Sequence, residues 1–194
     1  MKIYNLTFCD KMNYGAMLQC FAIQRISSLL EQETIHLELV PKFSFKTLLK
    51  NLFPRRLSMI YHSSKFIKNR IKNVILKQNL FDFLSNELEE TVLLVGSDQV
   101  WNPLINDNQF LCDFSLTNIR KRSYACSLGY FEKGDRLKNV MSKIQEFENI
   151  SVRESDVFEY FKSSSVSLTV RVRVMFIMPL SDSGRKVIGA VDVY

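Results

Sequence analysis

The stretch GSDQVWNP, residues 96–103, combines residue types that could bind a carbohydrate. Its polar side chains offer donors and acceptors that suit sugar hydroxyls, and they belong to Ser97, Asp98, Gln99 and Asn102. Trp101, the one tryptophan of the chain, could stack on a sugar or base ring or could instead cap the core. An ordinary turn capped by Asp98 and followed by a core tryptophan gives the same pattern, so both interpretations stay open.

The residues before this stretch indicate where it lies in a fold. TVLLV, residues 91–95, is a short unbroken apolar run, typical of a parallel strand that is buried on both faces. Gly96 follows directly and lets the chain turn sharply. Because ligands of open α/β sheets bind beyond the carboxyl ends of the strands, we expect the loop from Gly96 to Asn102 to line the main cleft.

A second loop, CDKMNYGA at residues 9–16, stands between a predicted strand and a predicted helix. Asn13 is suited to cap the helix, and Gly15 permits a close approach of backbone or ligand. Free backbone N–H groups at a helix start would suit a phosphate. A single glycine does not make the GxGxxG pattern, so no dinucleotide site is predicted. An ordinary capped turn explains the segment equally well.

Nucleophilic and metal-ligating residues are few and widely spaced. The four cysteines form no CxxC pair and stand at Cys9, Cys20, Cys112 and Cys126. Structural zinc sites need closely spaced thiol or imidazole pairs, so we predict reduced, partly buried thiols and no metal site. Strand alternation in TIHLEL places His36 on the polar face, and His62 stands in a basic stretch. Neither histidine is predicted to be catalytic.

The elements that position these residues alternate along the chain. Apolar patterns predict strands at 2–8, 34–40, 91–95, 122–128 and 150–153, with helices at 14–30, 79–88, 134–147 and 154–161. This alternation predicts an α/β fold, a Rossmann-like sheet of mainly parallel strands, over residues 1–161. Residues 109–114 are predicted as a short strand or turn. The tail, residues 162–194, has period-two patterning from Val166 to Val174 and is predicted to form a β-hairpin-like element.

Composition excludes several classes of protein. The 194 residues are 46% hydrophobic and 24% charged, which excludes disordered and low-complexity chains. No apolar run approaches the roughly 18 residues that span a bilayer, and the amino terminus has no apolar core of a signal peptide. The expected location is therefore cytoplasmic.

The positive charge is concentrated in one segment. Residues 41–81 hold ten lysines and arginines and no acidic residue. Apolar residues between 66 and 75 fall near helical spacing, which predicts a basic helical excursion. Its surface, residues 42–77, suits anionic lipid head groups at the inner face of a membrane, or a diphosphate-bearing substrate. A solvated helix that packs its apolar side on the domain is the alternative. No nucleic-acid-binding motif is present, so no nucleic acid partner is predicted.

Four blocks of sequence resemble the polysaccharide pyruvyl transferase family, in the family's order. They are NYGAMLQ at 13–19, GSDQVWNP at 96–103, SYACSLG at 123–129 and ISVRE at 150–154. The resemblance implies a two-domain, GT-B-like fold of two Rossmann-like halves. It also implies transfer of the pyruvyl group of phosphoenolpyruvate, as co-substrate, to a sugar of a bacterial cell-surface polysaccharide or its lipid-linked precursor, with no further cofactor. The substrate-binding residues it implies are Asn13, Tyr14, Gly15, Gly96, Ser97, Asp98, Gln99, Trp101, Asn102 and Ser127.

The sequence departs from the family after its fourth block. The Asp-Pro-Thr motif of the family is absent and no second Rossmann-like domain follows, so we expect an incomplete copy with a truncated or frameshifted end, inactive by itself. Arg153 is the candidate for binding the carboxylate or phosphate of the donor. A salt bridge to Glu154 or Asp156 is the alternative role for Arg153. Two other functions stay open: a non-catalytic saccharide-binding remnant, or a fragment of a nucleotide-sugar glycosyltransferase.

Overall fold

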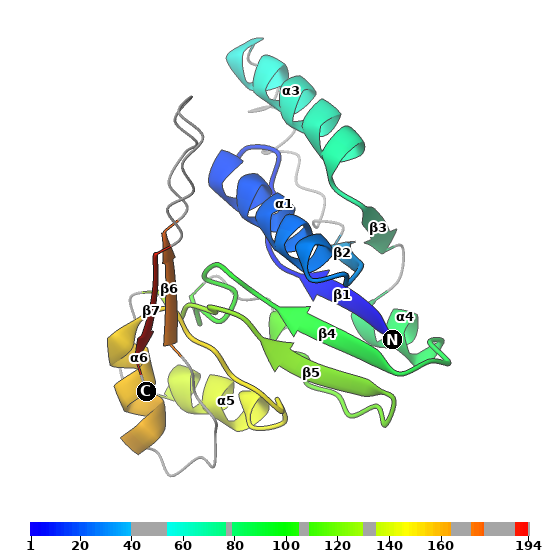
Figure 1. The fold of residues 1–194 in the computed structure, drawn as a ribbon. Coiled ribbons are helices and arrows are strands. Elements are labelled where there is room, and N and C mark those ends of the chain that lie inside the picture. Colours follow the sequence, from blue (N-terminus) through cyan, green and yellow to red (C-terminus); the bar gives the residue numbers. More distant parts are fainter. Residues whose placement is uncertain are drawn as a thin grey trace.

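Five short strands form one parallel sheet at the centre of the fold (Figure 1). They are β1 (Lys2–Leu6), β2 (Thr34–Leu39), β3 (Asn73–Leu76), β4 (Thr91–Val95) and β5 (Ile119–Ser123). Their order in the sheet is β3-β2-β1-β4-β5, and every pairing is parallel. This is a computed structural model, and it describes residues 1–39, 54–76, 79–104, 109–129, 135–163, 172–176 and 189–193. The predicted α/β class with a Rossmann-like sheet is confirmed.

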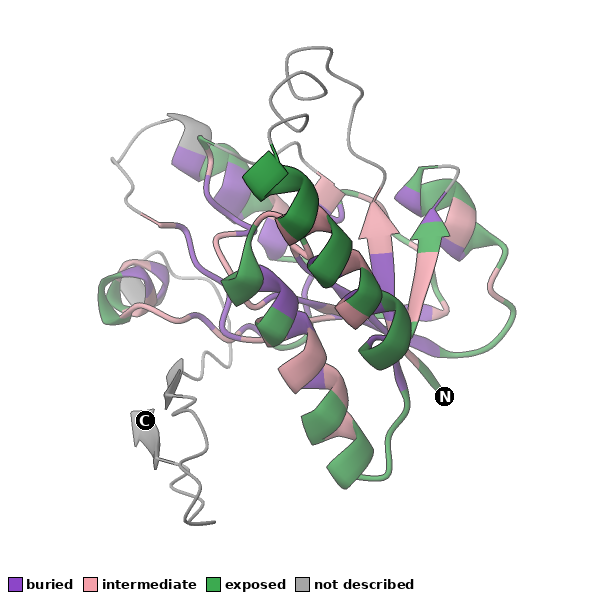
Figure 2. Ribbon diagram, turned by 90° about the horizontal axis from the view of Figure 1, so that it is seen from above, coloured by how far each residue is buried: buried purple, intermediate pink, exposed green. Residues whose placement is uncertain are grey.

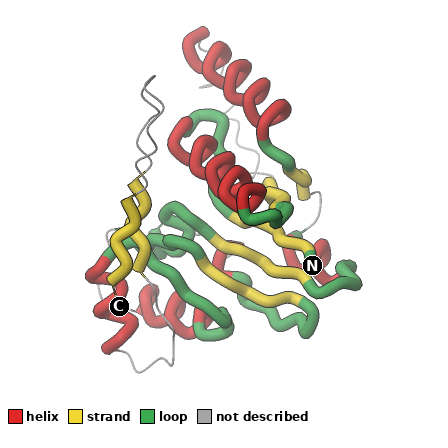
Figure 3. The backbone as a smooth tube through the Cα atoms, viewed as in Figure 1, coloured by secondary structure: helices red, strands yellow, loops and turns green. Residues whose placement is uncertain are grey.

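Helices cover both faces of this sheet (Figures 1 and 3). On one face lie α1 (Tyr14–Leu29) and α3 (Pro54–Arg70). On the other lie α4 (Leu80–Ser85), α5 (Asp135–Ile144) and α6 (Ser155–Ser163). A parallel sheet needs this cover because its strands are apolar on both faces. The predicted β4 run is accordingly buried at four of its five positions.

Two apolar clusters correspond to the two faces. The larger one joins β1 and β4 to α4, α5 and α6, and it includes Leu6, Leu93, Leu84, Leu137 and Phe161. The smaller one joins α1 to α3 and contains Met17, Cys20, Ile67 and Ile71. Figure 2 shows the consequence for α3, whose outward side is exposed along most of its length. That helix is thus attached to the domain through one narrow apolar stripe.

The basic segment contains a strand that the sequence pattern did not predict. Helical spacing predicts a helix through 66–75, but α3 ends at Arg70, and Val74 and Ile75 belong to β3. The segment can leave the helix because β2 offers an open edge, where the His36 N–H donates to the Lys72 carbonyl at 2.9 Å. Pairing with β2 satisfies the backbone groups along one side of β3.

The last sheet strand is also displaced from its predicted position. A strand was expected at 122–128, but β5 spans Ile119–Ser123, with the charged sequence IRKRS. Lys121 is buried there because Glu146 pairs with it at 2.6 Å and the Cys112 carbonyl accepts from it at 2.8 Å. Pairing makes a buried lysine tolerable, so a charged segment can form the edge of the sheet.

The remaining described segments fit the sequence patterns in part. Residues 109–111 form a 3-10 turn. Residues 149–152 make only isolated bridges to the sheet edge, not the predicted strand. β6 (Val172–Phe176) and β7 (Gly189–Val193) pair antiparallel, as the alternation predicts, whereas the start of that pattern at Val166 lies outside the described residues. No helix in the described ranges is long and apolar enough to cross a membrane.

A small polar cluster at the amino end of the sheet provides a test of this packing. Glu87 accepts a hydrogen bond from the Tyr4 hydroxyl at 2.6 Å and forms an ion pair with Lys2 at 2.9 Å. The bond from Tyr4 lowers the pKa of Glu87, and Lys2 acts in the same direction against the effect of burial. Because the folded pKa is below the unfolded one, the stabilisation is present at neutral pH and is lost as the pH falls from about 4.5.

We therefore expect Glu87→Gln to lower the free energy of unfolding by about 1 kcal/mol at pH 7, since the site is partly solvent-screened. The acid-side slope of stability against pH should become shallower. Urea unfolding followed by circular dichroism between pH 7 and pH 3 measures both. Glu159→Gln, at an exposed position of α6, is the control. Equal stability of Glu87→Gln and the control across this range would contradict the role of the cluster.

Candidate ligand-binding site at the carboxyl edge of the sheet

The loops after β1 and β4 meet at the point where the strand order reverses. β1 is followed by a helix on one face of the sheet, whereas β5, beyond β4, is followed by a helix on the other face (Figure 1). In doubly wound sheets such a point opens a crevice beyond the carboxyl ends of the strands. The Thr7 hydroxyl donates to the Ser97 carbonyl at 2.6 Å, and the Gln19 amide donates to Thr7 at 3.1 Å. Gln19 and Ser97, from two of the four sequence blocks, are therefore joined through one threonine.

The third block lies against the same loop, and the fourth block lies against the third. The Ser127 N–H donates to the Asp98 carbonyl at 2.9 Å, and the Trp101 N–H donates to the Ser127 carbonyl at 3.2 Å. Between the third and fourth blocks, the Arg153 N–H donates to the Cys126 carbonyl at 3.0 Å. Backbone bridges thus run from Asp98 through Cys126 to Val152. Segments that are far apart in the sequence form one continuous edge.

Gly96 is required by the close packing of this edge. Its φ is +107°, and a Cβ atom there would lie 2.4 Å from the Tyr124 carbonyl oxygen and 2.7 Å from Cys126 Sγ. Asp98 also has a positive φ, of 93°, which is uncommon for a residue with a side chain. Its carboxylate accepts from the Gln99 N–H at 2.8 Å. Unfavourable backbone of this kind persists where the surroundings impose it, frequently at binding sites.

Trp101 is not accessible to a ligand. Its side chain is fully buried, packs edge-to-face on Phe147 and donates from its indole N–H to the Phe110 carbonyl at 3.2 Å. The interpretation of Trp101 as a stacking platform for a sugar is therefore wrong, and the alternative, a core tryptophan, is what the structure contains. Burial of this large ring stabilises the loop far more than an exposed position would.

The remaining predicted site residues divide by exposure. Asn13, Tyr14 and Gly15 are exposed, and the Asn13 side chain caps α1 by accepting from the Ala16 N–H at 3.2 Å, as predicted. Ser97, Asp98 and Gln99 are partly exposed and could contact a ligand. Asn102 and Ser127 are buried, and Asn102 donates to Gln99 at 3.1 Å. Asn102 and Ser127 therefore shape the loop rather than offering free groups to a ligand.

Arg153 is already paired. Its guanidinium donates to Glu154 Oε1 at 3.2 Å, which confirms the predicted alternative of a salt bridge. The same carboxylate oxygen accepts from the Ser127 hydroxyl, which in turn accepts from the Gly129 N–H at 2.9 Å. Glu154 was not among the predicted site residues, and its Oε2 is buried without a hydrogen-bond partner in the described part of the chain. Adjacency to Arg153 in the fourth block was the signal that could have found it.

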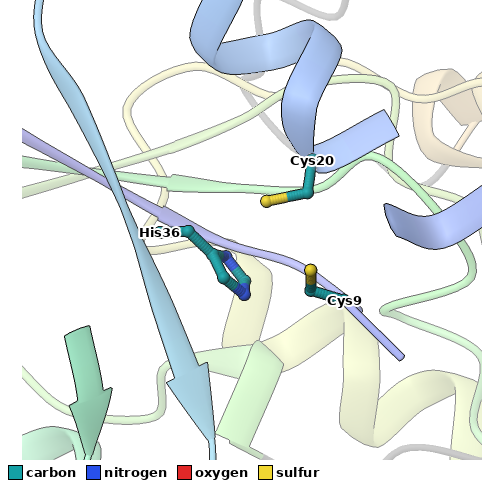
Figure 4. Close-up of side chains that lie close together, drawn as sticks. All are labelled: Cys9, Cys20 and His36. Atoms are coloured by element: carbon teal, nitrogen blue, oxygen red, sulfur yellow. The ribbon is translucent and has the colours of Figure 1, made fainter. Parts of the chain in front are cut away.

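A second group of functional side chains lies beside this edge (Figure 4). Cys9 follows β1, Cys20 is on α1 and His36 is on β2, and their ligand atoms all lie within 4.8 Å of one another. The polar face predicted for His36 is covered by α1, so its imidazole is 1% exposed and not solvated as expected. The cluster escaped prediction because spacing along the chain does not show which elements pack together.

The two thiols of this group influence each other. A hydrogen bond from Cys20 lowers the pKa of the Cys9 thiol, and His36 acts in the same direction against burial. That same hydrogen bond, together with burial, raises the pKa of Cys20. Burial raises the pKa of Cys112 to about 12 and that of Cys126 well above its ordinary value. Cys9 is therefore the one of the four cysteines whose pKa is lowered, and it is also the one that is partly exposed.

Comparisons of the chain with protein-family models, curated proteins and solved structures gave no match.

The packing of the edge predicts a large difference between two glycine substitutions. Gly96→Ala should destabilise the fold by about 3 kcal/mol or more, because the methyl group meets backbone atoms at a positive φ. Gly15→Ala should have a much smaller effect, since its methyl group meets a single side-chain atom, Asn13 Oδ1, at 3.3 Å and no backbone atom. Thermal unfolding of both variants measures the difference. Similar melting temperatures would show that the Gly96 loop is not held as described.

Proposed function

We propose that this chain forms the N-terminal Rossmann-like domain of a polysaccharide pyruvyl transferase. Such an enzyme transfers the pyruvyl group of phosphoenolpyruvate to a sugar of a surface polysaccharide or its lipid-linked precursor. One observation carries the proposal: hydrogen bonds link the four sequence blocks between residues 13 and 154 at a single sheet edge, the first to the second through Thr7 and the others directly. Blocks that served only the core would have no reason to meet at the edge where ligands of such sheets bind.

The five-stranded parallel sheet is compatible with one half of a GT-B-like fold, which is the finer part of the proposal. In that arrangement the crevice at β1 and β4 faces the partner half. We assign saccharide binding to the partly exposed groups of Asp98 and Gln99, whose oxygens and amide can pair with sugar hydroxyls. The buried tryptophan beneath them stiffens the loop and lowers the entropy lost on binding.

Arg153 is the residue that we propose binds the anionic donor, phosphoenolpyruvate. A guanidinium matches the geometry of a carboxylate or phosphate, but here Glu154 occupies one side of it. The Glu154 carboxylate offsets most of that positive charge, and the site is open to water. We therefore infer that this domain by itself binds phosphoenolpyruvate weakly and does not turn it over.

The exposed side of α3 supports a further part of the proposal, contact with an anionic membrane surface near lipid-linked acceptors. Its cationic residues are exposed, and they are Arg55, Arg56, Lys65, Lys68 and Arg70. Leu57 and Tyr61 are exposed on the same helix, 49% and 64% respectively. Cations together with apolar side chains are the combination that binds head groups and the acyl boundary. Residues 41–53 and 77–78 of the basic segment lie outside the described residues.

Saccharide binding by the intact chain tests the proposed site. Galactose, mannose and N-acetylmannosamine are the probes, and saturation-transfer NMR detects their contact with the protein. We expect binding of at least one of them, and about tenfold weaker binding to Asp98→Asn, because a hydrogen bond to a charged acceptor is replaced by one to a neutral acceptor. The control is Glu33→Gln, an exposed position just before β2, at the opposite end of the sheet.

Other outcomes of that experiment distinguish the alternatives. Binding of a nucleotide diphosphate sugar, with no response to the free sugars, would favour a nucleotide-sugar glycosyltransferase domain. Equal binding by Asp98→Asn and the wild type would place the saccharide elsewhere. A pyruvate ketal formed from phosphoenolpyruvate by the chain alone, detected by mass spectrometry, would contradict the inference that this domain is inactive.

A vesicle assay tests the membrane contact separately. The chain should sediment with vesicles that contain phosphatidylserine and not with neutral phosphatidylcholine vesicles, and added salt should weaken the interaction. Replacing Arg55 and Arg56 by Glu reverses two exposed charges in the first turn of α3 and should reduce sedimentation strongly. Binding that is independent of lipid charge, or unchanged in this variant, would rule out the contact.

A further inference from the structure

Three side chains from three different elements converge beside the edge of the sheet. Cys9 comes from the loop after β1, Cys20 from the second turn of α1 and His36 from the middle of β2 (Figure 4). Their ligand atoms lie within 4.8 Å of one another. In a tetrahedral zinc complex with Zn–S bonds of about 2.3 Å, two sulfur ligands are about 3.7 Å apart. Side-chain movements of about 1 Å would therefore bring these atoms to ligand spacing.

The histidine is held in the tautomer that a metal requires. Its Nδ1 lies 3.2 Å from the Asn5 carbonyl, which can only accept, so Nδ1 carries the proton in this contact. Nε2 then keeps its lone pair and can act as the ligand atom. Metal-binding histidines have this arrangement, in which an outer carbonyl or carboxylate orients the ring and sets the tautomer. Asn5 is itself fully buried in the central strand, so the orientation of the ring is fixed by rigid backbone.

The donor set indicates which cation suits the cluster. Two sulfurs and one imidazole nitrogen favour thiophilic ions such as Zn²⁺, whereas Mg²⁺ and Ca²⁺ require oxygen ligands. Cys20 and His36 are buried, but Cys9 is only partly so, which gives a path from solvent. Glu38 is two residues beyond His36 on the same side of β2, and its charge acts on both cysteines. That negative charge favours a cation at this position.

We propose that Cys9 Sγ, Cys20 Sγ and His36 Nε2 bind one Zn²⁺, with a fourth position on the solvent side for water or a ligand atom. Three protein ligands with one open position distinguish this site from closed structural zinc sites, which have four. Zinc here ties the loop after β1 to α1 and β2, directly beside Thr7 and Gln19. The site is independent of the proposed pyruvyl transfer, because none of its ligands belongs to the saccharide-binding residues.

Cobalt titration of the reduced, metal-free full chain tests the site. One equivalent of Co²⁺ should give the near-ultraviolet charge-transfer absorption of thiolate ligands and the intense visible bands of tetrahedral cobalt, and one equivalent of Zn²⁺ should abolish both. Cys9→Ser should lose about half of the charge-transfer absorption. It should also weaken Co²⁺ binding by more than the roughly 10- to 100-fold that loss of an outer partner costs. Cys112→Ala, whose thiol lies outside the cluster, should behave as the wild type.

A second measurement keeps the test decisive if a buried variant misfolds. Cys9 is in a loop and partly exposed, so Cys9→Ser should retain the far-ultraviolet spectrum of the wild type. Zn²⁺ should raise the melting temperature of the wild type and of Cys112→Ala, but not that of Cys9→Ser. Absence of charge-transfer absorption in the wild type, or absorption of undiminished intensity in Cys9→Ser, would overturn the proposal. A third result would also overturn it: a Cys9–Cys20 disulfide forms, and the chain binds no cobalt once that disulfide has been reduced.

Discussion

The pairing of β1 with β2 on one side and β4 on the other is the interaction on which the rest of the structure depends. Asn5, fully buried in β1, serves both sides of that pairing. Its side chain donates to the Leu94 and Gly96 carbonyls at 3.2 and 2.9 Å, and its own carbonyl contacts the His36 ring. One residue therefore holds the start of the Gly96 loop and the orientation of the histidine. Because these hydrogen bonds form in one alignment of the strands, the buried Asn5 side chain favours a single register.

Because both faces of a parallel sheet are buried, polar side chains that could bind a ligand reach solvent in few places. The carboxyl edge is one of them, and here it is built from segments that are half core and half surface. Trp101, Cys126 and Val152 are buried, while Ser97 and Asp98 are partly exposed a few residues away. The buried members hold the exposed ones in place. Such loops are preorganised for a ligand, because little conformational freedom remains to be lost when one binds.

Helix α1 links the two functional regions. Gln19 reaches the Gly96 loop through Thr7, and its neighbour Cys20 is part of the cluster with Cys9 and His36. Adjacent residues on a helix point about 100° apart, which lets one helix face two sites. A metal ion in the cluster would therefore restrain the same helix that is hydrogen-bonded, through Thr7, to the Gly96 loop. The two regions therefore share one helix and the loop after β1, although they have no residue in common.

Several features could be predicted from the sequence because they depend on neighbours in the chain. The buried run at 91–95, the Asn13 cap of α1, the alternation of strands and helices and the antiparallel tail pair all follow from local patterns, and the structure contains them. The salt bridge of Arg153 with Glu154 is of the same kind, since the two residues are adjacent.

Only the tertiary structure decided what depends on distant contacts. The end of α3 at Arg70 and the strand that follows it depend on the open edge of β2, which no pattern within 66–75 reveals. A tryptophan can stack on a ligand or pack in a core, and the sequence alone does not distinguish the two. Contacts with Phe110 and Phe147 show that Trp101 packs in the core. His36 is polar by type yet buried, because α1 covers that side of β2. Its meeting with Cys9 and Cys20 follows from packing, since chain spacing carries no information about which faces of a helix and a sheet come together.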